Sequence, residues 1–105
     1  MKNTSKIGNV KIKGKIFLSP MAGYTDVAFR TLCKRYGAAL VMTEFISSNT
    51  LVNADISTLQ QVKTSKEEKP LAFQLFGSDI ELVLKASKII DHICEMLIIN
   101  MGCPG

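Results

Sequence analysis

The sequence has few of the side chains that bind metals or form cross-links. It contains three cysteines, Cys33, Cys94 and Cys103, and one histidine, His92. The number of cysteines is odd, no pair has Cys-x-x-Cys spacing, and a single histidine cannot complete a metal cluster. We therefore expect no zinc site, no other metal and no disulfide framework. This cysteine usage favours a reducing compartment, the cytoplasm.

Long apolar runs and charge of one sign are also scarce. No segment approaches the roughly 20 apolar residues that cross a bilayer, and no apolar stretch typical of a signal peptide follows residues 1–6. The 13 basic and 9 acidic residues give a net charge of +4. This surplus permits an anionic partner such as a nucleic acid without requiring one, and a solvated lysine-rich surface is the alternative.

The chain is long enough for one small domain, with 105 residues of which 47% are hydrophobic. Short apolar runs predict buried strands over residues 16–18, 39–42, 71–76 and 96–99. Alternation of polar and apolar residues over 9–16 predicts a surface hairpin that turns at Gly14.

Two helices are predicted between these strands. The first follows an N-cap at Thr25 and ends at Gly37, and the second follows a capping box over 78–81. A short helix is expected over 58–62 and a charged loop over 63–69. The predicted apolar face of the first helix is Ala28, Phe29, Leu32, Cys33 and Tyr36, and that of the second is Ile80, Val83, Leu84, Ser87 and Ile90.

Apolar strands that alternate with helices predict a parallel α/β sheet covered on both faces. The strands begin near residues 16, 39, 71 and 96, close to the repeat of about 30 residues in a (β/α)8 barrel. The chain then corresponds to three βα units and the fourth strand of such a barrel, preceded by the hairpin. A doubly wound sheet is the rival, but its Gly-rich phosphate turn is missing after the first strand.

Polar or unusual residues follow each predicted strand. Residues 20–23 (PMAG) form a tight turn that either connects strand to helix or lets a flat ligand approach the backbone. Glu44 is expected to bind a substrate or a neighbouring lysine. Gln74 interrupts the third strand, and its buried amide must be hydrogen-bonded, either within the protein or to the ring of a flavin or nucleobase. The side-chain amide of Asn100 can likewise donate a hydrogen bond to a ring carbonyl and accept one from a ring N–H.

Cys103 follows the fourth strand between a glycine and a proline. It could act as a nucleophile, a metal ligand or an acid. A thiol with an ordinary pKa of about 8.5 stays mostly protonated at neutral pH, which suits a proton donor. Cys33 and Cys94 lie in apolar contexts and are expected in the core. His92 is expected at a helix end or on the surface.

Five segments together resemble the tRNA-dihydrouridine synthases. They are 19–26 (SPMAGYTD), 29–33 (FRTLC), 43–44 (TE), 70–78 (PLAFQLFGS) and 100–104 (NMGCP). The resemblance implies a flavin-dependent (β/α)8 barrel followed by a small helical domain that helps to hold tRNA. It also implies reduction of the C5–C6 double bond of selected uridines, with electrons passing from NADPH through FMN. The target uridine would be extruded from the folded tRNA.

The resemblance also implies roles for single residues. Pro20, Met21 and Ala22 would line the FMN ring and Gln74 would hydrogen-bond it. Asn100 would contact the target uracil, and Cys103 would be the proton donor.

On this interpretation, residues 1–105 are the N-terminal half of the FMN-binding barrel domain. The rest of the barrel and the helical domain would be absent, so we expect the isolated chain to be inactive and poorly folded. Two alternatives stay open. One is another FMN barrel enzyme, similar to dihydroorotate dehydrogenase, and the other is a truncated remnant without catalysis.

Overall fold

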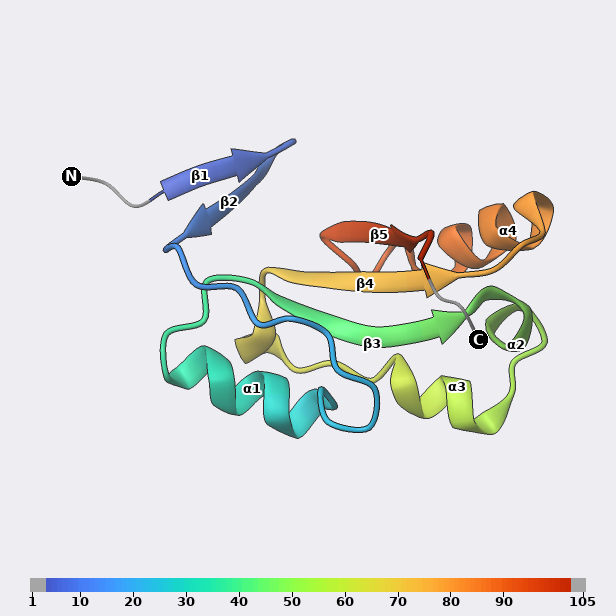
Figure 1. The fold of residues 1–105 in the computed structure, drawn as a ribbon, viewed down its shortest axis with the longest axis horizontal. Coiled ribbons are helices and arrows are strands. Elements are labelled where there is room, and N and C mark those ends of the chain that lie inside the picture. The colour runs from blue at the N-terminus through green and yellow to red at the C-terminus, as the bar shows by residue number, and fades with distance from the viewer. Residues whose placement is uncertain (1–3, 103–105) are drawn as a thin grey trace.

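The computed structural model describes residues 4–102. They contain a three-stranded parallel sheet with helices alongside it (Figure 1). The strands lie in chain order, β3-β4-β5, and a separate antiparallel hairpin precedes them. The strands are β1 Thr4–Ile7, β2 Val10–Lys13, β3 Val41–Ser47, β4 Leu71–Phe76 and β5 Met96–Asn100. The helices are α1 Val27–Arg35, α2 Ser48–Val52, α3 Ile56–Gln61, the 3-10 turn η1 Lys66–Glu68 and α4 Ile80–Ile90.

The sequence predicted β4 correctly and β5 to within one residue, and the mixed α/β class is confirmed. The predicted strand over 16–18 is reduced to a single parallel bridge between Phe17 and Leu40. It is held by hydrogen bonds from Leu18 N to Leu40 O (2.9 Å) and from Ala39 N to Ile16 O (2.7 Å). Pro20 has no N–H, so the pairing cannot extend far.

The predicted second strand, 39–42, is wrong at both ends. The strand begins at Val41 and continues through Thr43 and Glu44 to Ser47, with an irregular register between Met42 and Phe45. The two successive polar residues Thr43 and Glu44 had predicted the end of the strand. Thr43 nevertheless stays in the strand, since its buried hydroxyl accepts a hydrogen bond from Gln74 N (3.0 Å).

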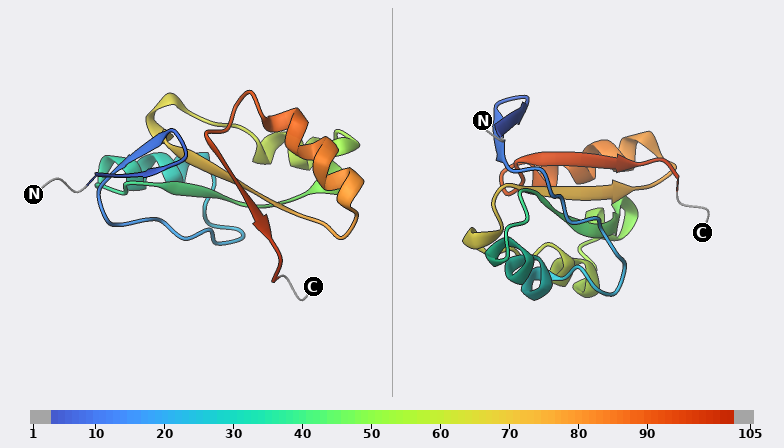
Figure 2. Two further views of the ribbon diagram at one scale, coloured as in Figure 1. Left: turned by 90° about the horizontal axis from the view of Figure 1, so that it is seen from above. Right: turned by 60° about the vertical axis from the view of Figure 1, so that its left-hand side comes forward.

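Each face of the sheet has its own apolar cluster. On the helix-covered face, residues of β3 and β4 pack against α2 and α4; the buried members are Val41, Ile46, Leu51, Leu71, Phe73, Leu75, Ala86 and Ile90. On the opposite face, Ile12 of β2 packs against Ala39, Leu40 and Ala72. The hairpin therefore covers the amino-terminal end of this second face, on the side of the sheet away from α1 and α3 (Figures 1 and 2).

The predicted helix starts and faces need correction. Asp26, not Thr25, caps α1, and Asp79, not Ser78, caps α4. The predicted apolar face of α1 is largely exposed, with Tyr36 at 86%, whereas Arg30 is buried. In α4, Val83 is half-buried and Ile90 buried as expected, but Ile80 and Leu84 are exposed. The buried residues Arg30 and Ala86 show that neighbouring elements, rather than hydrophobicity alone, decided these faces.

The connecting segments also differ from the predictions. The hairpin turns at Gly8 and Asn9 rather than at Gly14. Helix α2 was not predicted, α3 begins before residue 58, and the predicted loop over 63–69 contains η1. Within residues 4–102, no helix combines the length and apolarity needed to cross a membrane.

Candidate active site at the carboxyl ends of the strands

Gln74 and Asn100 form a hydrogen-bonded pair of amides on neighbouring strands. In the parallel register Gln74 lies opposite Ile98, and Asn100 lies two residues further along β5. Asn100 Nδ2 donates to Gln74 Oε1 at 2.8 Å, and Gln74 Nε2 donates to Thr43 O at 3.3 Å. Gln74 is only 7% exposed. The predicted need of this buried amide for partners is therefore met within the protein.

The contacts continue beyond the strand end. Gly102 N donates to Asn100 Oδ1 at 2.9 Å, so a polar chain runs from Thr43 through Gln74 and Asn100 to the segment after β5. Each primary amide has two N–H donors and two acceptor lone pairs. Asn100 therefore keeps one donor and one acceptor for a ligand, and Gln74 Nε2 keeps one donor.

The turn over residues 20–25 is fixed in shape by Thr25. Thr25 is fully buried; its hydroxyl accepts from Met21 N (3.1 Å) and donates to Met21 O (3.2 Å). Gly23 adopts a φ of +83°, which favours glycine. Met21 and Ala22 stay exposed and Pro20 half-buried. The turn thus presents small and apolar surface on a rigid backbone.

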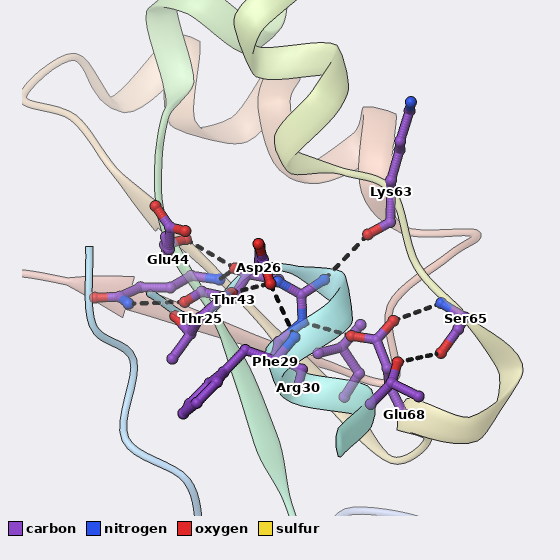
Figure 3. A network of polar contacts seen from close by, with 12 residues as sticks. Thr25, Asp26, Phe29, Arg30, Thr43, Glu44, Lys63, Ser65 and Glu68 are labelled. Atoms are coloured by element: carbon purple, nitrogen blue, oxygen red, sulfur yellow. Dashed lines mark hydrogen bonds and ion pairs between the residues drawn. The ribbon is translucent and has the colours of Figure 1, made fainter. Parts of the chain in front are cut away.

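Glu44 joins this turn to the sheet. Its Oε2 accepts a hydrogen bond from Gly23 N at 3.0 Å. Glu44 directly follows Thr43, whose hydroxyl and carbonyl oxygens accept hydrogen bonds from Gln74; Figure 3 labels both Thr43 and Glu44. Neither predicted role for Glu44, a substrate contact or a lysine partner, describes this interaction. Through Thr43 and Glu44, β3 positions both the amide pair and the turn over 20–25.

A cleft of about 510 Å³ opens beside Asn100 at the carboxyl ends of the strands. Its walls are Ser47, Ser48, Asn49, Phe76, Gly77, Ser78, Asp79, Leu82, Asn100 and Met101. Gln74 and residues 20–22 do not line it, so among residues 4–102 Asn100 is the one predicted site residue in the cleft wall. Cys103 lies outside the described residues, and its role stays a prediction.

Arg30 and Glu68 form a buried ion pair that sequence reasoning missed (Figure 3). Arg30 also donates to Thr25 O (2.6 Å) and to Lys63 O (3.0 Å). Glu68 completes a capping box with Ser65. The pair therefore fixes α1, the turn over 20–25 and the segment before β4 together. Its partners lie 38 residues apart, so no local pattern reveals it.

The sequence also predicted environments for Cys94, Cys33 and His92. Cys94 packs against the helix-side core, where burial raises the pKa of its thiol, with Asp91 and Glu95 adding to the effect. Cys33 is half-buried and His92 exposed, as expected for His92. Among residues 4–102, no three histidine, cysteine or acidic side chains are grouped so as to hold a metal ion.

The chain matches one family model and several curated proteins. Residues 17–105 match the family model described as "Dihydrouridine synthase (Dus)". The chain is 41% identical to tRNA-dihydrouridine synthase B of Shewanella oneidensis over 101 residues, 95% of this chain and 31% of the relative. It is 38% identical to the same-named protein of Pseudomonas putida over 102 residues, with coverage of 95% and 30%. A "Probable tRNA-dihydrouridine synthase" of Rickettsia bellii is 36% identical over 102 residues, with coverage of 95% and 31%.

The chain belongs to the dihydrouridine synthase family. It spans about three tenths of the length of the curated relatives that it matches.

Proposed function

We propose that this chain contributes to a flavin-dependent tRNA-dihydrouridine synthase, which reduces the C5–C6 double bond of uridines in tRNA. The observation that supports this most directly is the Gln74–Asn100 amide pair at the carboxyl ends of parallel strands, in a chain of this family. Ligand sites of α/β folds lie at that end of the sheet. We also propose that the enzyme works in the cytoplasm, a reducing compartment that the cysteine usage favours.

The residues present fit a flavin. Gln74 Nε2 has one N–H beyond its bond to Thr43 O, which suits an acceptor on the flavin ring. The turn over 20–22 offers apolar surface to a planar group and is held by Thr25 and Glu44. Pro20, Met21, Ala22 and Gln74 would hold FMN. When reduced by NADPH, FMN supplies a hydride to the uracil ring.

Asn100 and Cys103 would handle the uracil. The free N–H of Asn100 can donate to a ring carbonyl, and the free lone pair of Oδ1 can accept from a ring N–H. Hydride addition to one carbon of the double bond leaves carbanion character on the other carbon. The Cys103 thiol would protonate that carbon and become a thiolate, which regains a proton from solvent.

We further propose that residues 1–105 form the first part of a (β/α)8 barrel. The parallel strands β3, β4 and β5 pair in chain order, residues 16–18 pair beside the start of β3, and helices occupy the connections. Further βα units and a helical tRNA-binding domain would lie in the rest of the protein.

The test is mass spectrometry of tRNA from cells that lack the gene. Specific dihydrouridines should disappear and return when the complete gene is restored. The purified product of the complete gene should bind FMN and oxidise NADPH only when unmodified tRNA is present. Intact dihydrouridine, or a response to dihydroorotate instead of tRNA, would contradict the proposal.

Cys103→Ala tests the proton donor. The variant should keep bound FMN but lose uridine reduction by about 10²–10⁴-fold, the usual contribution of a positioned acid. Cys33→Ala, at a half-buried position in α1, is the matched control and should retain activity. An unchanged dihydrouridine yield in Cys103→Ala would remove this residue from the acid role.

A further inference from the structure

Lysines gather at the end of the sheet opposite the candidate active site. Four of them, Lys11, Lys13, Lys34 and Lys69, line a cleft of about 330 Å³ whose other walls are Ala38, Ala39 and Pro70. The lining residues come from β2, the end of α1 and the segments that precede β3 and β4. Figure 1 shows the hairpin at the end of the sheet opposite the carboxyl ends of β3, β4 and β5. No acidic side chain lines it among the described residues.

The hairpin extends this basic surface. Lys6 of β1 pairs directly with Lys11 of β2, and Lys11 and Lys13 share one face because side chains two apart in a strand point the same way. Like charges that face each other across a strand pair destabilise it. The hairpin nevertheless places Lys6 opposite Lys11. On its other face, the fully buried Ile12 packs against the sheet.

Lys34 is half-buried and lines the cleft. Its ammonium donates to Ala39 O at 2.9 Å, and no second acceptor among the described residues takes a hydrogen bond from it. Burial lowers the pKa of this ammonium, and Glu95 only partly offsets the effect. Glu95 also lies 3.5 Å from Lys69 Nζ. This carboxylate is therefore the local counter-charge, and the lysines outnumber it.

We propose that the surface formed by Lys6, Lys11, Lys13, Lys34 and Lys69 binds the phosphate backbone of RNA. Among residues 4–102, no aromatic or amide side chain that could read a base lines the cleft, and lysines recognise phosphates as point charges. Lys11 and Lys13 lie about 7 Å apart along β2, and Lys6 widens the surface beyond what a single phosphate covers. An extended polyanion therefore fits better than a small anion.

This inference rests on the proposed function, which makes tRNA the RNA in question. Strand β4 has six residues and so is about 20 Å long. A folded tRNA is far longer than that. One tRNA can therefore place a uridine at the carboxyl ends of the strands while another part of its backbone reaches the lysines.

The experiment measures binding of unmodified tRNA to the product of the complete gene, as a function of salt. Each lost phosphate contact lowers the slope of log affinity against log salt by about 0.7–0.9. The double variant Lys11→Gln/Lys13→Gln should therefore bind roughly tenfold more weakly at 0.1 M salt, with a slope lower by about 1.5. Lys85→Gln/Lys88→Gln, at exposed positions on α4, should change neither value.

Activity separates this inference from the proposed function. At saturating tRNA the Lys11/Lys13 variant should keep its kcat and raise only KM, and Lys11→Arg/Lys13→Arg should restore affinity. An unchanged affinity and slope in an enzyme that reduces tRNA would overturn the inference alone. Competition by millimolar inorganic phosphate without a slope change would indicate a small-anion site and also overturn it. Failure of the unmodified enzyme to bind or reduce tRNA would contradict the proposed function.

Discussion

Arg30 shows how one buried side chain can hold three segments together. Its guanidinium pairs with Glu68 and donates to carbonyls of Thr25 and Lys63, while its side chain is only 3% exposed. A charge removed from water is stabilised only if its partners are in place. Arg30 therefore links the turn over 20–25, which we propose to face the flavin, to the segment that precedes β4.

Replacement of Arg30 by methionine should leave the buried Glu68 carboxylate without a positive charge beside it, with only its hydrogen bond from Ser65 N. Loss of one member of a buried pair costs about 3–5 kcal/mol, so urea unfolding of the complete protein should shift to clearly lower denaturant. Arg35→Met is the matched control, since it removes the exposed pair with Glu67, whose side chains are 62% and 53% exposed. Similar midpoints for the two variants would show that the buried network contributes little.

Gln74 shows what the sequence could and could not predict about the site. Its position in an apolar strand predicted a buried amide with hydrogen-bond partners, and this is confirmed. The partners Thr43 and Asn100 lie 31 and 26 residues away, so only the strand register reveals them. Arg30 and Glu68 were missed for the same reason, because a buried ion pair leaves no periodic signal.

Strands and helices were predicted best where the sequence carried one clear hydrophobic pattern. The apolar run of β4 was sufficient to give its bounds, whereas the polar residues Thr43 and Glu44 concealed the second half of β3. The spacing of hydrophobic residues predicted the wrong buried face for α1, because the buried residue of this helix is Arg30. Packing against neighbouring segments, which a local pattern does not contain, decided these cases.

The start of α4 gives a prediction at the scale of an element. Asp79 accepts from the backbone N–H groups of Glu81 (2.9 Å) and Leu82 (3.3 Å), whereas Ser78 was predicted as the cap. Asp79→Ala should lower the free energy of unfolding by about 1 kcal/mol, measured by urea titration. Ser78→Ala should have little effect. A larger loss of stability in Ser78→Ala than in Asp79→Ala would instead support the capping box predicted from the sequence, with Ser78 as the cap.

In the molecule as a whole, the sheet separates two surfaces of different chemistry. Its carboxyl end carries the neutral Gln74–Asn100 amide pair, and its amino end carries the lysines that we propose bind RNA phosphates. The hairpin forms part of the second surface and touches the sheet through Ile12 and the residues around Ala39. The position of the hairpin therefore determines whether the lysines of β2 and α1 face a common cleft.

Gly14 lies where the hairpin approaches Ala39. Its φ is +131°, and a Cβ added there would lie 2.9 Å from Ala39 Cβ, so Gly14→Ala must both strain the backbone and push the hairpin away. Strain and overpacking each cost on the order of 1–3 kcal/mol. Gly37→Ala is the matched control, since its φ of +104° is also strained but no atom beyond its own chain neighbours lies within 4 Å of the added Cβ.

Gly14→Ala should therefore unfold at lower urea than Gly37→Ala. It should also weaken tRNA binding, because the lysines of β2 would move away from Lys34 and Lys69, while Gly37→Ala leaves binding unchanged. Equal stability and equal tRNA affinity in the two variants would show that the contact between Gly14 and Ala39 does not hold the hairpin in place.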